Sequence, residues 1–386
     1  MKEGGFLKKT YFPFLLSAVL LFSGCGSVPV EQRITPEQAV TGGESRTFSK
    51  EFALEHRTDP PLTDQSSAYL TEDFGGIEGT GWVPIRFVDN DSFLYRERAE
   101  DSQNPWVCRY HLRTGQKDKL FPVQGGAGNL FRENASNFSF ADNLGVISIK
   151  DDRIETEISF ASWKQEHQEY EACDIVANPR TGKIALVDNT TWKCILTDFD
   201  LKEVSALPFE GVYRAGWVDD DNLILGAFDQ VEKHQGSAVI TYNIQDKATT
   251  KTYIGDNEVF VDPYRDSGDY CGFTYLDDDH GPPGTLGVVD YTKNKIIFLK
   301  LSNIAWYLNL QYNWVIAAAA DQPIDWDVWG GTTEGTVNLC VYDAAAGSYG
   351  IRARNLSRPN GAVIISPDGR TIIYQSFSKN YLIREK

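Results

Sequence analysis

The segment Ile364–Tyr374 restricts the possible folds more than any other part of the chain. An apolar, β-branched run enters a Ser-Pro-Asp-Gly turn at residues 366–369, and a second such run leaves it. Proline presets φ at the second turn position and glycine accepts a positive φ, so the chain reverses here between two antiparallel strands. Similar short runs ending in Asp, Asn or Gly turns recur upstream, and no window of about 12 residues follows a helical period. The sequence therefore predicts an all-β chain.

The turns recur at spacings typical of a repeat protein. Aligned on the turn between the first two strands of each unit, they lie about 38 to about 57 residues apart, the period of a four-stranded propeller blade with variable loops. The seven turns are residues 89–91, 142–143, 179–182, 219–222, 266–269, 311–313 and 367–369. We therefore predict a β-propeller of seven four-stranded blades. A pair of β-sandwiches or an irregular β-solenoid is the alternative architecture.

The second half of the units repeats as well, for example in Tyr110–Gly115 and Tyr342–Gly347. Together with Ser366–Thr371, this Tyr-Asp-x-x-x-Gly ending resembles the repeats of TolB-type and WD40-like β-propellers. The resemblance covers roughly residues 75–386. It implies the fold and leaves the function open, because propellers serve many functions. The Trp-Asp and Gly-His pairs of true WD40 repeats are missing from their expected places.

The seventh unit is incomplete, because only one more strand, at residues 381–384, follows Tyr374. An open last blade would leave a long unpaired strand edge, which closed propellers avoid. We therefore predict that an N-terminal strand closes the last blade, either Arg46–Leu54 or Ser66–Leu70.

The N-terminus has the pattern of a processing signal. Lysines are followed by an apolar run over residues 11–22, too short for the roughly 20 residues that span a bilayer. The run ends in Ser23-Gly24-Cys25, which resembles the lipobox of bacterial lipoproteins, although Phe22 departs from the usual Leu, Val or Ile. The resemblance implies lipidation of Cys25 and a chain held at the cell membrane or outer membrane, facing the extracytoplasmic side. An ordinary signal peptide with an incidental cysteine is the alternative.

The expected organisation is a signal peptide over 1–24, a polar tether over 25–65 and the propeller over 66–386. The closing strand is expected either within the tether or at the start of the propeller. The net charge is −17, and loss of residues 1–24 removes three lysines and one glutamate, giving −17 − 2 = −19. Such an acidic chain is unsuited to nucleic acid. We expect a monomer whose membrane contact comes from the lipid alone.

The residues that could carry chemistry give little support for catalysis. Five cysteines follow Cys25 without CxxC spacing, so they indicate neither a zinc site nor a disulfide framework, although a single disulfide stays open. Cys108 and Cys340 lie in apolar strand patterns and are interpreted as buried thiols. The five histidines form no HExxH motif, and no serine lies in a G-x-S-x-G turn. We predict no catalytic residue, no metal ligand and no cofactor.

Long acidic and aromatic segments are expected between the second and third strands of several blades, at Ala99–Pro105, Asp229–Gly236, Asp277–Gly284 and Asp321–Gly335. Long loops gathered on one end of a rigid scaffold are the usual place for recognition. Two of them supply the candidate ligand-binding residues, which are Asp277, Asp279, His280, Asp325, Trp326, Asp327 and Trp329.

Each of these candidates has a simpler alternative. The Asp277–Gly284 segment could hold calcium but lacks the alternating spacing of a calcium loop, so a solvated acidic turn is the favoured interpretation. Both tryptophans could instead pack between blades. The predicted function is a non-catalytic envelope lipoprotein that binds a protein, peptide or glycan. The alternatives are a carbohydrate-active hydrolase or lyase and a structural scaffold of an envelope assembly complex.

Overall fold

The computed structural model describes most of the chain from Ser45 to the C-terminus. The described residues are 45–77, 81–98, 105–122, 129–132, 138–142, 145–151, 153–166, 173–178, 180–188, 190–202, 204–230, 235–255, 259–260, 270–275, 285–300, 304–321 and 335–386. The lipidation candidate Cys25 lies outside them.

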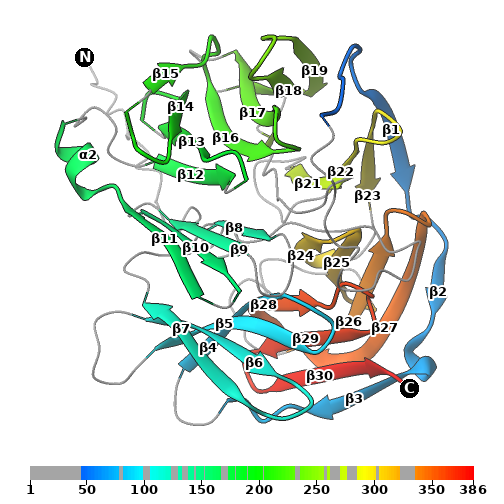
Figure 1. The fold of residues 1–386 in the computed structure, drawn as a ribbon. Helices are drawn as coiled ribbons and strands as arrows, with labels where there is room; N and C mark the ends of the chain where they lie inside the picture. Colours follow the sequence, from blue (N-terminus) through cyan, green and yellow to red (C-terminus); the bar gives the residue numbers. More distant parts are fainter. Residues whose placement is uncertain are drawn as a thin grey trace, which may run out of the picture.

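Seven sheets, antiparallel within each four-stranded blade, surround a common centre and form a seven-bladed β-propeller (Figure 1). Blades 1 to 3 are built in chain order from β4 (Gly81–Phe87), β5 (Ser92–Arg98), β6 (Trp106–His111) and β7 (Lys117–Pro122), then β8 (Asn129–Arg132), β9 (Phe138–Asp142), β10 (Gly145–Lys150) and β11 (Arg153–Ser159), then β12 (Cys173–Asn178), β13 (Lys183–Asp188), β14 (Lys193–Asp198) and β15 (Val204–Ala206). One short helix, α2 (Ala161–Glu166), lies between blades 2 and 3.

The later blades follow the same plan. Blades 4 to 7 are built from β16 (Val212–Trp217), β17 (Asn222–Gln230), β18 (Gln235–Asn243) and β19 (Thr249–Gly255), then β20 (Val259–Phe260), β21 (Tyr270–Tyr275), β22 (Thr285–Asp290) and β23 (Lys295–Lys300), then β24 (Ile304–Gln311), β25 (Trp314–Ala319), β26 (Thr336–Asp343) and β27 (Ser348–Ser357), then β28 (Pro359–Ile365), β29 (Thr371–Ser376) and β30 (Asn380–Glu385), completed by β3 (Tyr69–Asp73).

The predicted register is confirmed for five of the seven turns, because each lies between the first two strands of its blade. The turn predicted at 266–269 lies outside the described residues, between the first two strands of blade 5. Blade 2 is the exception. There Asp142 ends the second strand, β9, and Gly145 begins the third, β10, so the turn at 142–143 belongs to the opposite face of the ring. The prediction was wrong at this place because a tight Asp-Asn turn can join either pair of strands, and its sequence does not reveal which.

The closing strand comes from the N-terminal side, as predicted. Strand β3 begins within the second of the two proposed segments and pairs antiparallel with β30, with Tyr69 opposite Glu385 and Asp73 opposite Tyr381. This pairing supplies the fourth strand of blade 7, so β30 is no longer an open edge.

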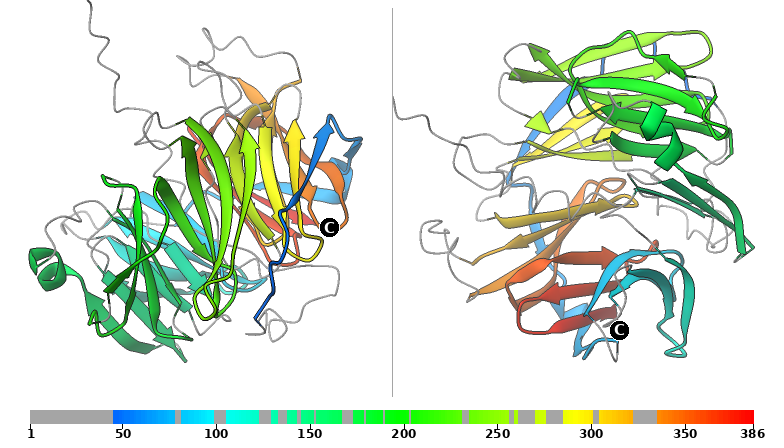
Figure 2. Two further views of the ribbon diagram at one scale, coloured as in Figure 1. Left: turned by 90° about the horizontal axis from the view of Figure 1, so that it is seen from above. Right: turned by 90° about the vertical axis from the view of Figure 1, so that its left-hand side faces the viewer.

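The preceding residues are also part of the propeller, although they lie in the segment expected to be a tether. Strand β1 (Ala53–Thr58) pairs in parallel with β23, and β2 (Leu62–Asp64) pairs in parallel with β27, so blades 5 and 6 have five strands. A short 3-10 helix, η2 (Ser66–Ala68), leads into β3. Residues 45–74, which we call the N-terminal belt, therefore follow the outer rim from blade 4 to blade 7 (Figures 1 and 2).

The core is divided among the contacts between neighbouring blades. The described residues form seven apolar clusters, one at each interface, including the interface between blades 7 and 1. In β29, Ile372 packs toward blade 6 and Ile373 toward blade 1. Because a strand alternates its side chains between two faces and both faces are covered, these strands read as continuous apolar runs.

Cys108 and Cys340 are buried free thiols, as predicted, and Cys194 is a third. Within the described ranges, no helix has the length and apolar character needed to cross a membrane.

Candidate functional site

The two faces of the ring differ in the connections that they carry. Turns between first and second strands and between third and fourth strands lie on one face. The opposite face, which we call the loop face, carries the second-to-third connections and the links between blades. The strand bounds place all four long predicted segments as second-to-third connections, as expected. The seven candidate ligand-binding residues, Asp277, Asp279, His280, Asp325, Trp326, Asp327 and Trp329, themselves lie outside the described residues.

Phe377 is the main feature of the described part of the loop face. It lies in the turn between β29 and β30, and 56% of its side chain is exposed, the highest value for a large hydrophobic residue in the part of the chain that the structure describes. An aromatic ring left in water on a rigid scaffold is the kind of group that anchors a binding partner.

The Phe377 turn is fixed by hydrogen bonds from Ser376. The Ser376 hydroxyl donates to the carbonyl oxygen of Lys379 over 2.6 Å and accepts from the backbone nitrogens of Ser378 and Lys379 at 3.3 and 3.0 Å. The Phe377 nitrogen donates to the carbonyl oxygen of Arg358 over 3.3 Å. The ring is therefore presented by an ordered backbone, so little conformational entropy remains to be lost on binding.

A second set of bonds joins this turn to the end of blade 6. Ser378 donates its hydroxyl to the Ser357 hydroxyl over 2.8 Å, and the Ser357 hydroxyl lies 3.0 Å from that of Tyr381. Tyr374 donates to the Ser357 carbonyl oxygen over 2.7 Å. Ser357, at the end of β27, thus connects blade 6 to the turn that carries Phe377.

Two cationic side chains lie near the Phe377 turn, Arg358 beside the ring itself and Lys379 beside Tyr381. The Arg358 guanidinium carbon lies 6.0 Å from the ring centroid, and burial of this side chain, which is 8% exposed, lowers its pKa. Lys379 is exposed, and its ammonium lies 4.7 Å from the Tyr381 ring centroid. Of the other Arg residues in blades 6 and 7, Arg354 and Arg384 are paired with Asp64 and Glu72, so the positive charge near the Phe377 turn comes from Arg358 and Lys379. This part of the surface therefore favours anionic or hydrogen-bond-accepting groups.

Polar side chains also join the strands on either side of residues 322–334. The Asn338 amide on β26 donates to Oδ1 of Asp321, just after β25, over 2.6 Å. Arg354 on β27 places Nη1 3.7 Å from the same oxygen, and its Nε and Nη2 each lie 2.9 Å from Oδ2 of Asp64. We call the Phe377 turn and this Asp321–Asn338–Arg354 group the blade 6–7 corner.

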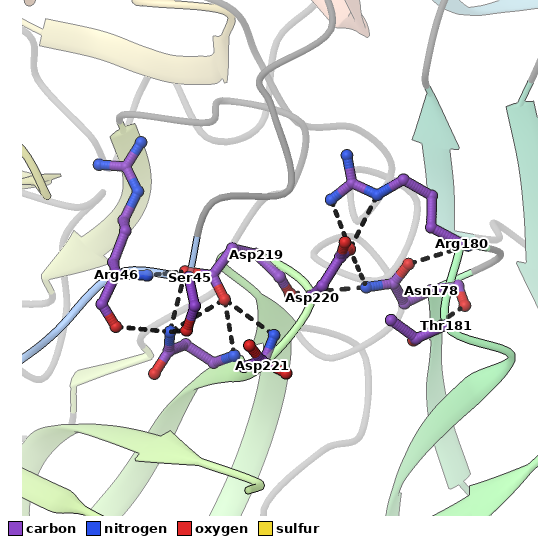
Figure 3. A network of polar contacts seen from close by, with 9 residues as sticks. Ser45, Arg46, Asn178, Arg180, Thr181, Asp219, Asp220 and Asp221 are labelled. Atoms are coloured by element: carbon purple, nitrogen blue, oxygen red, sulfur yellow. Dashed lines mark hydrogen bonds and ion pairs between the residues drawn. The ribbon is translucent and has the colours of Figure 1, made fainter.

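The opposite face carries the acidic run Asp219–Asp221, which invites interpretation as a cation site. Figure 3 shows instead that its carboxylates bind protein groups. Asp219 accepts from the Arg46 backbone nitrogen over 2.9 Å, and Asp220 accepts from Nε and Nη2 of Arg180 over 2.8 and 2.6 Å. The run therefore attaches the N-terminal belt to blade 4 and joins blade 4 to blade 3.

No group of three or more His, Cys, Asp or Glu side chains that could hold a metal ion occurs among the described residues. The corner combines an exposed aromatic ring, hydroxyls and cations, which are groups that can contact a ligand.

Sequence reasoning assigned the long segments correctly to second-to-third connections, but it did not single out Phe377. The signal available was an aromatic residue flanked by serines, Ser376-Phe377-Ser378, where an apolar strand ends. The sequence gives no such signal for Arg354 and Asp64, because residues 290 positions apart come into contact only when the propeller closes.

Comparison with known proteins supports the fold alone. No protein-family model matches the chain. No curated protein matches it in sequence either. Three solved structures share its architecture, each with a TM-score of 0.50. An oligogalacturonate lyase from Vibrio parahaemolyticus is 11% identical, over 82% of this chain and 96% of that one.

The β-propeller domain of Cps50 (Swd1) from Myceliophteria thermophila is also 11% identical, over 82% and 100% of the two chains. An uncharacterized protein from Listeria monocytogenes is 13% identical, over 79% and 92%. These likenesses show a WD40-like β-propeller fold, and at identities of 11% to 13% they select no function.

Proposed function

We propose that the chain is an extracytoplasmic lipoprotein whose β-propeller binds a protein, peptide or glycan, without catalysis, through the blade 6–7 corner of the loop face. The observation that carries this proposal is Phe377, a largely exposed aromatic ring held by a hydrogen-bonded turn. The partner presents an apolar or aromatic surface to this ring and an anionic or accepting group to Lys379.

The membrane address rests on the N-terminal sequence. Cys25 follows an apolar run and two small residues, and lipid attached there is the anchor that this acidic chain needs. In the Cys25→Ala variant, the protein moves from washed membranes to the soluble envelope fraction or the medium. Retention of the variant in membranes at the wild-type level would contradict the lipid anchor.

The binding function is tested by capturing partners from envelope extract and screening a glycan array with the mature domain, using wild type and Phe377→Ala in parallel. Ile154→Ala is the matched control, because Ile154 is 47% exposed on β11 at the rim, away from the corner. Loss of an anchoring ring costs about 2 kcal/mol, so binding weakens roughly 30-fold. Equal binding by both variants would refute recognition at this corner.

A further inference from the structure

The N-terminal belt reaches the blade 6–7 corner after running around half of the rim. Asp64, the last residue of β2, accepts from the backbone nitrogen and hydroxyl of Ser66 over 3.0 and 2.7 Å at Oδ1. Its Oδ2 accepts from Arg354 over 2.9 Å. One carboxylate therefore holds the start of η2 and a side chain of blade 6.

Arg354 belongs to an irregular end of β27 that depends on side chains for its hydrogen bonds. The next residue, Asn355, has a left-handed φ of 54°, and its backbone nitrogen donates to the Asn338 side-chain oxygen over 3.4 Å. The Ser357 nitrogen donates to the Tyr381 hydroxyl over 3.2 Å. Where backbone donors are satisfied by side chains instead of a ladder, the backbone geometry follows the placement of those side chains.

The same short segment serves both parts of the corner. Its Arg354 end contacts Asp321, and its Ser357 end supports the turn that carries Phe377. The belt makes a second contact with this turn, because the Phe74 nitrogen, directly after β3, donates to the carbonyl oxygen of Asn380 over 3.0 Å.

We propose that the N-terminal belt positions the recognition corner and that Asp64 and Arg354 are its positioning residues, acting through Asn355 and Ser357. The recognition role of this corner rests on the proposed function. The belt continues into the N-terminal segment that would carry the lipid anchor. Displacement of the belt therefore changes the geometry of the corner although the belt does not contact the ligand.

The test measures amide hydrogen exchange of Asn355 and Ser357 in the mature domain without any ligand. In Asp64→Asn, which keeps the shape and removes the charge, both amides exchange about 1.4-fold to fivefold faster, the range expected for one exposed ion pair. Asp64→Glu restores the carboxylate and stays near the wild-type rates, and Arg354→Gln repeats the effect of Asp64→Asn.

Glu72→Gln is the matched control. Glu72 on β3 pairs with Arg384 at 3.0 Å with exposures of 43% and 48%, close to the 49% and 39% of Asp64 and Arg354, but this ion pair joins β3 to β30 and not to β27. In Glu72→Gln, the amide exchange rates of Asn355 and Ser357 stay at the wild-type values. The proposal would be overturned if the exchange rates of Asn355 and Ser357 were unchanged in Asp64→Asn or rose equally in Glu72→Gln. A uniform rise in exchange that includes β13 and β14 of blade 3 would also overturn it. Because no ligand is present, this result is independent of whether Phe377 binds a partner.

Discussion

Gly369→Ala tests the turn on which the fold prediction was founded. Gly369 has a φ of +72°, and a Cβ atom there would lie 2.3 Å from Cζ2 of Trp314. Trp314 is 5% exposed, and its indole nitrogen donates to the Pro367 carbonyl oxygen over 3.3 Å, so the ring has little room to move. A left-handed conformation costs a residue with a Cβ about 1–2 kcal/mol, and overpacking adds about 1–3 kcal/mol.

We therefore expect Gly369→Ala to lower the free energy of unfolding by about 3 kcal/mol. Gly115→Ala separates the two contributions, because Gly115 has a similar φ of +70° while a Cβ atom there would lie 3.7 Å from its nearest neighbour, the Tyr110 hydroxyl. That variant should lose about 1 kcal/mol. Urea unfolding with equal m-values reports both changes. Equal losses in the two variants would refute the packing of this turn against Trp314.

Four further predictions concern closure, the core, the belt and the long loops. A chain that begins at residue 75 lacks β3 and should aggregate or elute as oligomers through the open edge of β30, whereas one that begins at residue 45 stays monomeric by light scattering. Burial raises the pKa of Cys108 to about 12 and of Cys340 to about 11, so neither thiol reacts with a labelling reagent at pH 8 until the protein is unfolded. Fast labelling of Cys108 or Cys340 in the native protein, located by peptide mass spectrometry, would contradict their placement. Hydrogen bonds from Ser66 and Arg354 lower the pKa of Asp64 from 3.8 to about 2. The melting-temperature difference between wild type and Asp64→Asn should therefore be constant from neutral pH to about pH 4 and disappear toward pH 2. Loss of this difference already at pH 5 would argue against the pairing. Trp326→Ala/Trp329→Ala should weaken binding with an unchanged melting temperature, while a large drop in melting temperature would show that the indoles pack in the core.

The sequence was sufficient for the architecture because propeller blades repeat a local pattern. Turn residues such as Pro367-Asp368-Gly369 identify strand reversals, and runs such as Lys295–Lys300 are apolar throughout their interior because both faces of the strand are covered. The turn at 142–143 shows the limit of this reasoning, since a hairpin turn identifies a reversal and not its position within the blade.

The belt and the corner could not be predicted in the same way. Strand β1 is held to β23 by backbone hydrogen bonds at an edge, and its sequence, Ala-Leu-Glu-His-Arg-Thr, has little of the β-branched and aromatic character that marks an interior strand. Phe377 is a candidate binding residue because its side chain is exposed, and that exposure depends on how blades 6 and 7 pack. The pairing of Asp64 with Arg354 exists only because the ring brings the two ends of the chain together.

The central claim is that recognition occurs at the blade 6–7 corner, and a hydrogen-exchange footprint of the domain with a captured partner tests it most directly. Peptides covering 354–358 and 374–382 should become protected on binding, while the turns at 89–91 and 219–222 on the opposite face keep their exchange rates. Protection confined to those turns, or to the rim strands β7, β11 and β15, would contradict the claim and would favour a scaffold that makes contact through its blade edges.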